Sequence, residues 1–247
     1  MSGHSKWSQI KRQKGATDVK RGAIFTKMTR EIMLAAKEGG GDPDANFRLR
    51  LAVDRARGVN MPLANIQRAI ERATGGAAGE VIESVVYEGY GPGGVSILVE
   101  AATDNRNRTA PEVRAAFAKH NGSLGAPGSV SWQFEHKGVV EIAAAGRDVD
   151  EISLTAIDAG AEDVEADGES ITVTTAPAAL RKVKDALEAA GLSVESAELT
   201  MRPTNIVTLD GEQGRKVLRL VEALEDLDDV SKVHANFDVP EEILANA

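Results

Sequence analysis

Basic side chains with almost no acid among them crowd the first thirty residues of the chain. Asp18 is the single acid in this stretch. A solvated helical face usually mixes both signs of charge, so this run favours contact with a polyanion over plain solvation. Trp7 lies within it and is able either to stack on a base or to pack against the protein. We predict a nucleic-acid-binding arm formed by Lys6, Trp7, Lys11, Arg12, Lys14, Lys20, Arg21, Lys27 and Arg30.

The rest of the chain has the opposite charge. The formal net charge is -9, from 29 Lys and Arg against 38 Asp and Glu. Residues 1–76 hold 15 basic and 7 acidic residues, net +8, whereas residues 77–247 hold 14 and 31, net -17. An evenly acidic surface would repel nucleic acid, but here the positive charge is gathered at one end.

No residue pattern indicates catalysis. The chain has no Cys, which removes thiol chemistry, disulfides and iron–sulfur clusters. No nucleophile elbow or His-based metal motif occurs. We expect no enzymatic activity, no metal and no cofactor. The histidines are scattered singly, at His4, His120, His136 and His234.

The glycine-rich segment Gly89–Gly94 does not fit a phosphate-binding loop. The residues that follow it, Val95–Val99, are strand-forming, whereas a phosphate loop must lead into a helix. The alternatives are a hairpin turn and a rigid loop that offers Tyr87 and Tyr90 to a partner.

Two arginines, Arg106 and Arg108, lie in a second loop, between a predicted strand end and a helix start. They are able to grip an anion together with the helix amides. Alternatively, Asp104 and the asparagines of this loop bond its own backbone. The acids Asp226, Asp228 and Asp229 fall in a helix-to-strand turn, where we expect them to serve solubility and local turn bonds.

Hydrophobic spacing predicts three amphipathic helices before residue 77. The first runs from about residue 20 to Gly39. The second starts with Asp42 as N-cap and ends at Gly58, and the third runs from Met61 to Gly75. Together they form a small bundle, on whose outer face we expect Arg68 and Arg72 to be available for binding.

After Gly79 the apolar period changes from 3.6 to 2. Residues 80–136 read as ββαβ, with a helix capped by Thr109 and a strand that buries Trp132. Residues 137–203 read as βαββαβ, the ferredoxin-like order. The tail, 204–247, supplies strand, helix and strand, which are too few to fold alone.

The predicted fold class is therefore α+β with three domains. These are an N-terminal three-helix domain and two ferredoxin-like-type α+β sandwiches, one inserted in the other. The expected boundaries are 1–79 for the arm and helical domain, 80–136 plus 204–247 for a discontinuous domain, and 137–203 for the inserted domain. Residues 137–203 have no aromatic residue and a net charge of -8, which argues against RNA binding there. We expect a spacer or a protein-contact surface.

Several motifs resemble the YebC/PmpR family, whose mitochondrial members are translational activators of cytochrome oxidase. They are Gly3-His-Ser-Lys-Trp7, Lys20-Arg-Gly-Ala-Ile-Phe-Thr-Lys27, Asn60-Met-Pro62, Tyr87-Glu-Gly-Tyr-Gly-Pro-Gly-Gly94, Thr103-Asp-Asn-Arg-Asn-Arg-Thr109 and Gly122-Ser-Leu-Gly125. The resemblance implies three domains, no enzymatic activity, and a DNA-binding transcriptional regulator. Other members act on the ribosome and assist synthesis of proline-rich stretches.

We therefore expect a regulator of gene expression that binds nucleic acid, either DNA or ribosomal RNA. DNA is the target that the resemblance favours, and a ribosome-associated translation factor is the alternative. The start of the chain lacks the apolar stretch of a signal peptide, and no apolar run is long enough to span a bilayer. We expect a cytoplasmic monomer with no membrane partner.

Overall fold

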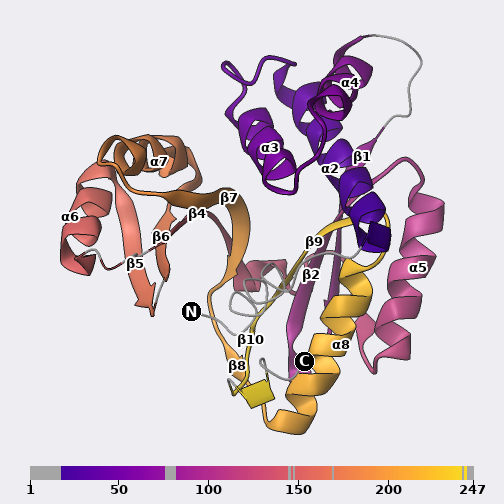
Figure 1. Cartoon of the computed structure of the whole chain (residues 1–247). Coiled ribbons are helices and arrows are strands. Elements are labelled where there is room, and N and C mark those ends of the chain that lie inside the picture. Colours follow the sequence, from indigo (N-terminus) through magenta and orange to yellow (C-terminus); the bar gives the residue numbers. More distant parts are fainter. Residues whose placement is uncertain are drawn as a thin grey trace. The chain divides into compact units, whose positions relative to one another are not determined.

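The computed structural model describes residues 18–75, 82–143, 146, 148–168, 170–240 and 242–243, with side chains from Arg21 onward. The chain divides into two compact units (Figure 1). The inner unit is residues 135–202, and the enclosing unit consists of the residues up to Phe134 together with those from Pro203. One unit is thus inserted in the other, and the predicted α+β class is confirmed.

Among the described residues of the enclosing unit, the first elements are the helices α2 (Asp18–Gly39), α3 (Phe47–Gly58) and α4 (Leu63–Thr74). Ile32, Leu49 and Ile66, each at most 2% exposed, bring the three helices into one core. The prediction that Asp42 caps α3 is wrong. The N-cap is Asn46, whose Oδ1 accepts from the Leu49 amide at 3.1 Å while its Nδ2 donates to the Ala35 carbonyl at 2.8 Å. The side-chain amide of Asn46 both accepts and donates, so it bonds the backbone of α3 and of α2. The carboxylate of Asp42 has no donor and could bond only one of them.

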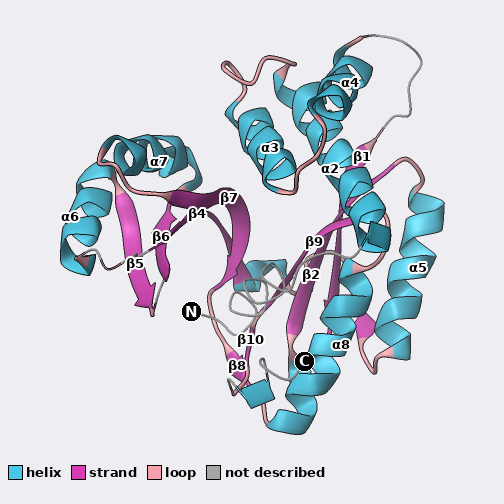
Figure 2. Cartoon of the chain, in the orientation of Figure 1, coloured by secondary structure: helices cyan, strands magenta, loops and turns pink. Residues whose placement is uncertain are grey.

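A four-stranded antiparallel sheet in the order β3-β1-β2-β9 follows in the same unit (Figure 2). Side chains of α5 and α8, among them Phe117 and Leu220, pack on Ile97 and Val99 from one face of this sheet. The elements are β1 (Glu83–Tyr90), β2 (Ser96–Thr103), α5 (Arg106–Lys119), β3 (Ser123–Leu124), α8 (Gly211–Glu225) and β9 (Val230–Ala235).

Residues 130–133 do not form the predicted strand, which begins only at Phe134. A 3-10 turn, Ser131–Gln133, precedes β4, and Trp132 is 71% exposed rather than buried. The cause is Glu88, whose carboxylate accepts the amides of Val130 and Ser131 and so removes them from any ladder. The prediction of a buried Trp132 is therefore wrong. The remaining short elements are the 3-10 turn Pro92–Gly94 and a parallel pair, β8 (Val207–Thr208) with β10 (Phe237–Asp238).

The inner unit is a ferredoxin-like sandwich. Its strand order, β5-β6-β4-β7, is the one that two split βαβ units give when they interlock. Ile142, Ile171 and Leu187 are fully buried in it. The elements are β4 (Phe134–Ala143), α6 (Val149–Ala159), β5 (Ala161–Asp167), β6 (Ser170–Thr175), the 3-10 turn Pro177–Ala179, α7 (Leu180–Ala189) and β7 (Val194–Pro203).

Within the described residues, every helix is too short or too polar to cross a bilayer.

Candidate nucleic-acid interface

The predicted arm falls largely outside the part of the chain that the structure describes. Lys20 lies in the first turn of α2, but its side chain is also outside the described part. Arg21, the next residue, is exposed. The candidates outside the described residues are Lys6, Trp7, Lys11, Arg12 and Lys14.

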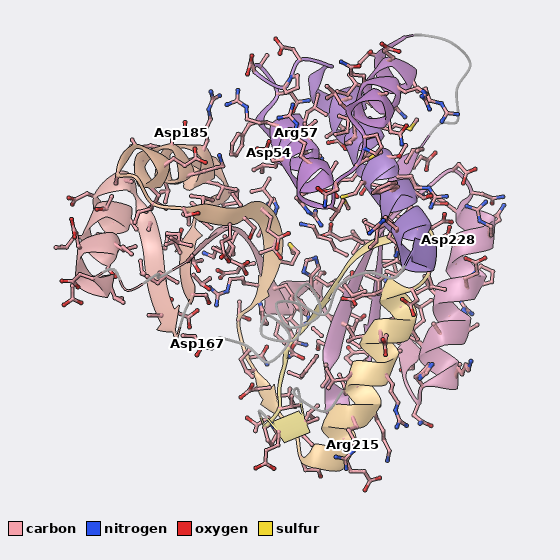
Figure 3. The ribbon with its side chains drawn as sticks, viewed as in Figure 1. Asp54, Arg57, Asp167, Asp185, Arg215 and Asp228 are labelled. Carbon is pink, nitrogen blue, oxygen red and sulfur yellow. The ribbon has the colours of Figure 1, made fainter. Side chains whose placement is uncertain are left out.

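Two further candidates on α2, Lys27 and Arg30, bond to residues at and after the end of α8 in the same unit. Lys27 Nζ donates to the Glu225 carbonyl at the end of α8. Arg30 donates to the Asp228 carbonyl, and its Nη1 lies 2.9 Å from Asp229 Oδ1. Figure 3 shows Asp228 beside α2. Both cations therefore join α2 to the turn after α8, and phosphate contact would compete with these bonds.

The outer face of α4 is different. Arg68 and Arg72 are one helical turn apart and both are exposed, while Ile66 and Ala69 are buried on the opposite side of the helix. Neither arginine has an ion-pair partner among the described residues. These two guanidinium groups are therefore open to an anionic partner.

Other arginines of the helical region are paired with acids. Arg48 bonds Glu38, Arg50 lies 2.9 Å from Asp44, and Arg55 lies 2.7 Å from Glu31. On α3, Arg57 and Asp54 are neighbours 3.9 Å apart (Figure 3). Ion pairs with acids thus occupy these arginines of the α3 region, whereas Arg68 and Arg72 have no ion-pair partner among the described residues, although the exposed Glu71 lies between them on α4.

A buried carboxylate, Asp229, organises the base of the helical region. It is 2% exposed and accepts hydrogen bonds from Thr109 Oγ1 at 2.6 Å and Thr103 Oγ1 at 3.0 Å. Arg108 Nη2 lies 2.7 Å from it, and Arg30 approaches from α2. Asp229 therefore links α2, β2, α5 and β9. The prediction that it serves only solubility and local turn bonds is wrong.

The electrostatics of Asp229 follow from these donors. Burial alone would raise the pKa of its carboxyl. The hydrogen bonds from Thr109 and Arg108, the charge of Arg30 and the bond from Thr103 outweigh burial, so the pKa lies below its ordinary value. Asp229 is thus charged and stabilises the fold at neutral pH.

The polar and charged groups of the loop before α5 bond to one another and to Glu83, and so do not form an open anion site. Asn105 Oδ1 accepts from the Arg108 amide at 3.2 Å, so Asn105 is the N-cap and the predicted Thr109 cap is wrong. Arg106 lies 2.6 Å from Glu83, and Arg108 is 2.8 Å from Asp104. The guanidinium groups of Arg106 and Arg108, predicted to contact a partner or grip an anion, are therefore both matched with acids.

The tyrosines of the glycine-rich segment have different surroundings. Tyr87 packs against the sheet core, its hydroxyl has no hydrogen-bond partner in the described part, and burial raises its pKa. Tyr90 is 38% exposed, and its hydroxyl donates to the Ser129 carbonyl. Of the two, Tyr90 is the one accessible to a partner.

Glu88, which sequence reasoning missed, fixes the neighbouring loop. Its carboxylate accepts the amides of Gly128, Val130 and Ser131 at 2.6, 2.7 and 2.8 Å. Burial would raise the pKa of Glu88, but these three bonds lower it below its usual range. The signal available in the sequence is an acid that follows Val85, Val86 and Tyr87 and precedes Tyr90, because a charge placed among such residues needs partners.

Comparison with known proteins decides the family. Residues 5–76 match the TACO1/YebC protein N-terminal domain, and residues 82–237 match the TACO1/YebC second and third domain. The chain belongs to the TACO1/YebC family. The resemblance inferred from the sequence motifs is thereby confirmed.

Relatives of this TACO1/YebC protein cover nearly all of it. A probable transcriptional regulatory protein from Rubrobacter xylanophilus is 54% identical over 246 residues, 99% of this chain and 98% of its own. One of the same description from Trichlorobacter lovleyi is 55% identical over 239 residues, 97% of this chain and 96% of its own. The crystal structure of a conserved hypothetical protein from Aquifex aeolicus superposes with a TM-score of 0.84 at 48% identity, covering 92% of this chain and 94% of that one.

Proposed function

We propose that this TACO1/YebC protein is a non-catalytic regulator of gene expression that binds nucleic acid, with DNA as its target. The observation that carries this proposal is the segregation of charge, net +8 in residues 1–76. It is joined by Arg68 and Arg72 on α4, which are exposed and have no ion-pair partner among the described residues. Positive charge that is not matched by neighbouring acids releases counterions when it meets phosphates. The names of the relatives, probable transcriptional regulatory proteins, support a role in regulation.

The alternative target is ribosomal RNA, which would make the protein a ribosome-associated translation factor assisting synthesis of proline-rich stretches. Two arginines one helical turn apart suit phosphate contacts, which position a protein on a folded RNA as well as on a duplex. Of the side-chain types on α4 that read base edges in DNA, Asn65 is half-buried and Gln67 is exposed. The choice of target therefore needs a direct comparison.

Two assays on the full chain make that comparison. Wild-type protein that protects a discrete promoter segment, without sedimenting with ribosomes at moderate salt, establishes the DNA target. Co-sedimentation without a footprint establishes the ribosome and overturns the DNA target. Binding in neither assay overturns the proposed function.

The joint replacement Arg68→Ala and Arg72→Ala tests the α4 surface in the same assays. We expect about tenfold weaker binding and a salt slope smaller by about 2, because two phosphate contacts are lost. The matched control is Arg48→Ala with Arg57→Ala, which removes the same charge from exposed but acid-paired positions. If both double variants lose affinity equally, the total positive charge of the helical region, and not the α4 face, determines binding.

A further inference from the structure

Both exposed aromatic side chains of the described residues meet at one carbonyl. Tyr90 is 38% exposed and Trp132 is 71% exposed. The Tyr90 hydroxyl donates to the Ser129 carbonyl oxygen at 3.0 Å, and Trp132 Nε1 donates to the same oxygen at 3.1 Å. The polar edges of the two rings are thus anchored at one point, while much of their surface faces solvent.

The shared carbonyl belongs to a segment that is fixed on both sides. Glu88, 8% exposed, binds the amides of Gly128, Val130 and Ser131, which flank Ser129. Two hydrogen-bonded rings on a pinned backbone lose little conformational freedom when they bind a ligand.

Core packing does not account for the position of Trp132. An indole that is 71% exposed removes little apolar surface from water. The neighbouring Val130 and Phe134, at 0% and 6% exposed, supply the packing of this segment instead. The ring is therefore available for an external contact.

Charge around the two rings suits a polyanion better than a basic peptide. Residues 121–134 contain no acidic residue, although the chain beyond residue 76 is strongly acidic. Glu88, which binds the three amides, is buried, and the next acid along the chain, Glu135, is exposed but lies 3.0 Å from Lys137 Nζ. No exposed carboxylate within residues 121–134 repels a phosphodiester there.

We propose that Tyr90 and Trp132 form a stacking platform for an unpaired nucleobase. This platform is a second contact with nucleic acid, distinct from the arm and α4, and it rests on the proposed function. Aromatic side chains stack on any base because each base has a π-face, so the platform recognises exposed bases rather than a sequence. It selects single-stranded or looped-out nucleotides over an intact duplex.

Fluorescence of Trp132 tests this directly. The chain has two Trp, so Trp7→Phe leaves Trp132 as the one tryptophan. We titrate the full-length Trp7→Phe protein with a 12-nucleotide oligouridylate and with an abasic oligonucleotide of equal length and charge. We expect quenching of Trp132 by the oligouridylate and none by the abasic strand, because stacking needs the base.

Affinity provides the second readout. Trp132→Ala should weaken oligouridylate binding about tenfold without changing the salt slope, since no charge is removed. Trp132→Phe, which keeps an aromatic face, should retain most of the affinity. A thermal melt equal to wild type is expected for both variants, because the ring is exposed.

The outcomes separate the two proposals. Oligouridylate binding without quenching, and unaffected by Trp132→Ala, overturns the platform but leaves the proposed function standing. Failure of wild-type protein to bind either oligonucleotide, duplex DNA or ribosomes overturns the proposed function as well. Quenching by an oligolysine peptide and by neither oligonucleotide overturns the platform in favour of a protein partner.

Discussion

Asp229→Asn is expected to lower the free energy of unfolding of the enclosing unit by about 3 kcal/mol, because it removes the charge on which buried donors and two arginines converge. The carboxylate is 2% exposed, so water cannot replace it. Urea unfolding followed by near-ultraviolet circular dichroism measures the effect. This signal reports the enclosing unit, since residues 137–203 contain no aromatic residue.

Asp228→Asn is the matched control for this prediction. Asp228 is adjacent and exposed, and it receives Arg30 through its backbone carbonyl, which the substitution keeps. A change within about 0.5 kcal/mol is expected for an exposed side chain. Equal destabilisation by both variants would contradict the central role of Asp229.

The effect of Asp229 also depends on pH. Because its pKa is lowered in the folded chain, its stabilisation is complete above the unfolded pKa of about 3.9 and is lost as the pH falls through the folded pKa. The difference between wild type and Asp229→Asn should therefore be constant from about pH 7 to 5 and shrink in more acidic solution.

Replacing Lys11, Arg12 and Lys14 together by Ala is expected to weaken nucleic-acid binding by roughly 100-fold near 0.1 M salt. Each lost phosphate contact lowers the salt slope by about 0.7 to 0.9, and this counterion contribution vanishes near 1 M salt. Affinities measured at several salt concentrations give both quantities.

The acidic inner unit offers a matched control for the triple substitution. Arg181, Lys182 and Lys184 have the same spacing and the same summed charge, but they lie in a segment whose net charge is -8. Their replacement by Ala should leave the affinity within about twofold, because an acidic surface binds few phosphates. Unchanged affinity and slope in the Lys11, Arg12 and Lys14 variant would refute the binding arm.

The sequence predicted those elements whose cues are local. The first helix of the predicted βαββαβ order is α6, which has clear local boundaries, because Asp148 precedes an amphipathic run and Gly160 follows it in a left-handed conformation. The βαββαβ order of the inner unit was predicted for the same reason, since each strand alternates and each helix has a clear apolar face.

Features that depend on distant residues were not predictable. Thr109 looked like a cap, but its hydroxyl is engaged by Asp229, which follows it by 120 residues. Trp132 looked like a core residue because its alternation with Val130 and Phe134 is strand-like, whereas Glu88 takes the amides a strand would use. Lys27 and Arg30 looked like pure surface cations because Glu225 and Asp229 are remote in sequence.

The pairing of β2 with β9 has a consequence for the order in which a growing polypeptide acquires its structure. Strands β1 and β2 leave the synthesis machinery early, the whole inner sandwich comes next, and the last partner strand arrives near the carboxyl end. All strands and helices of the ferredoxin-like sandwich have been synthesised by residue 203, so this unit is able to fold first. Until Val230–Ala235 is synthesised, the edge of β2 that pairs with β9 has no partner strand. A nascent chain that stops within α8 would therefore expose an unpaired strand edge, which favours aggregation.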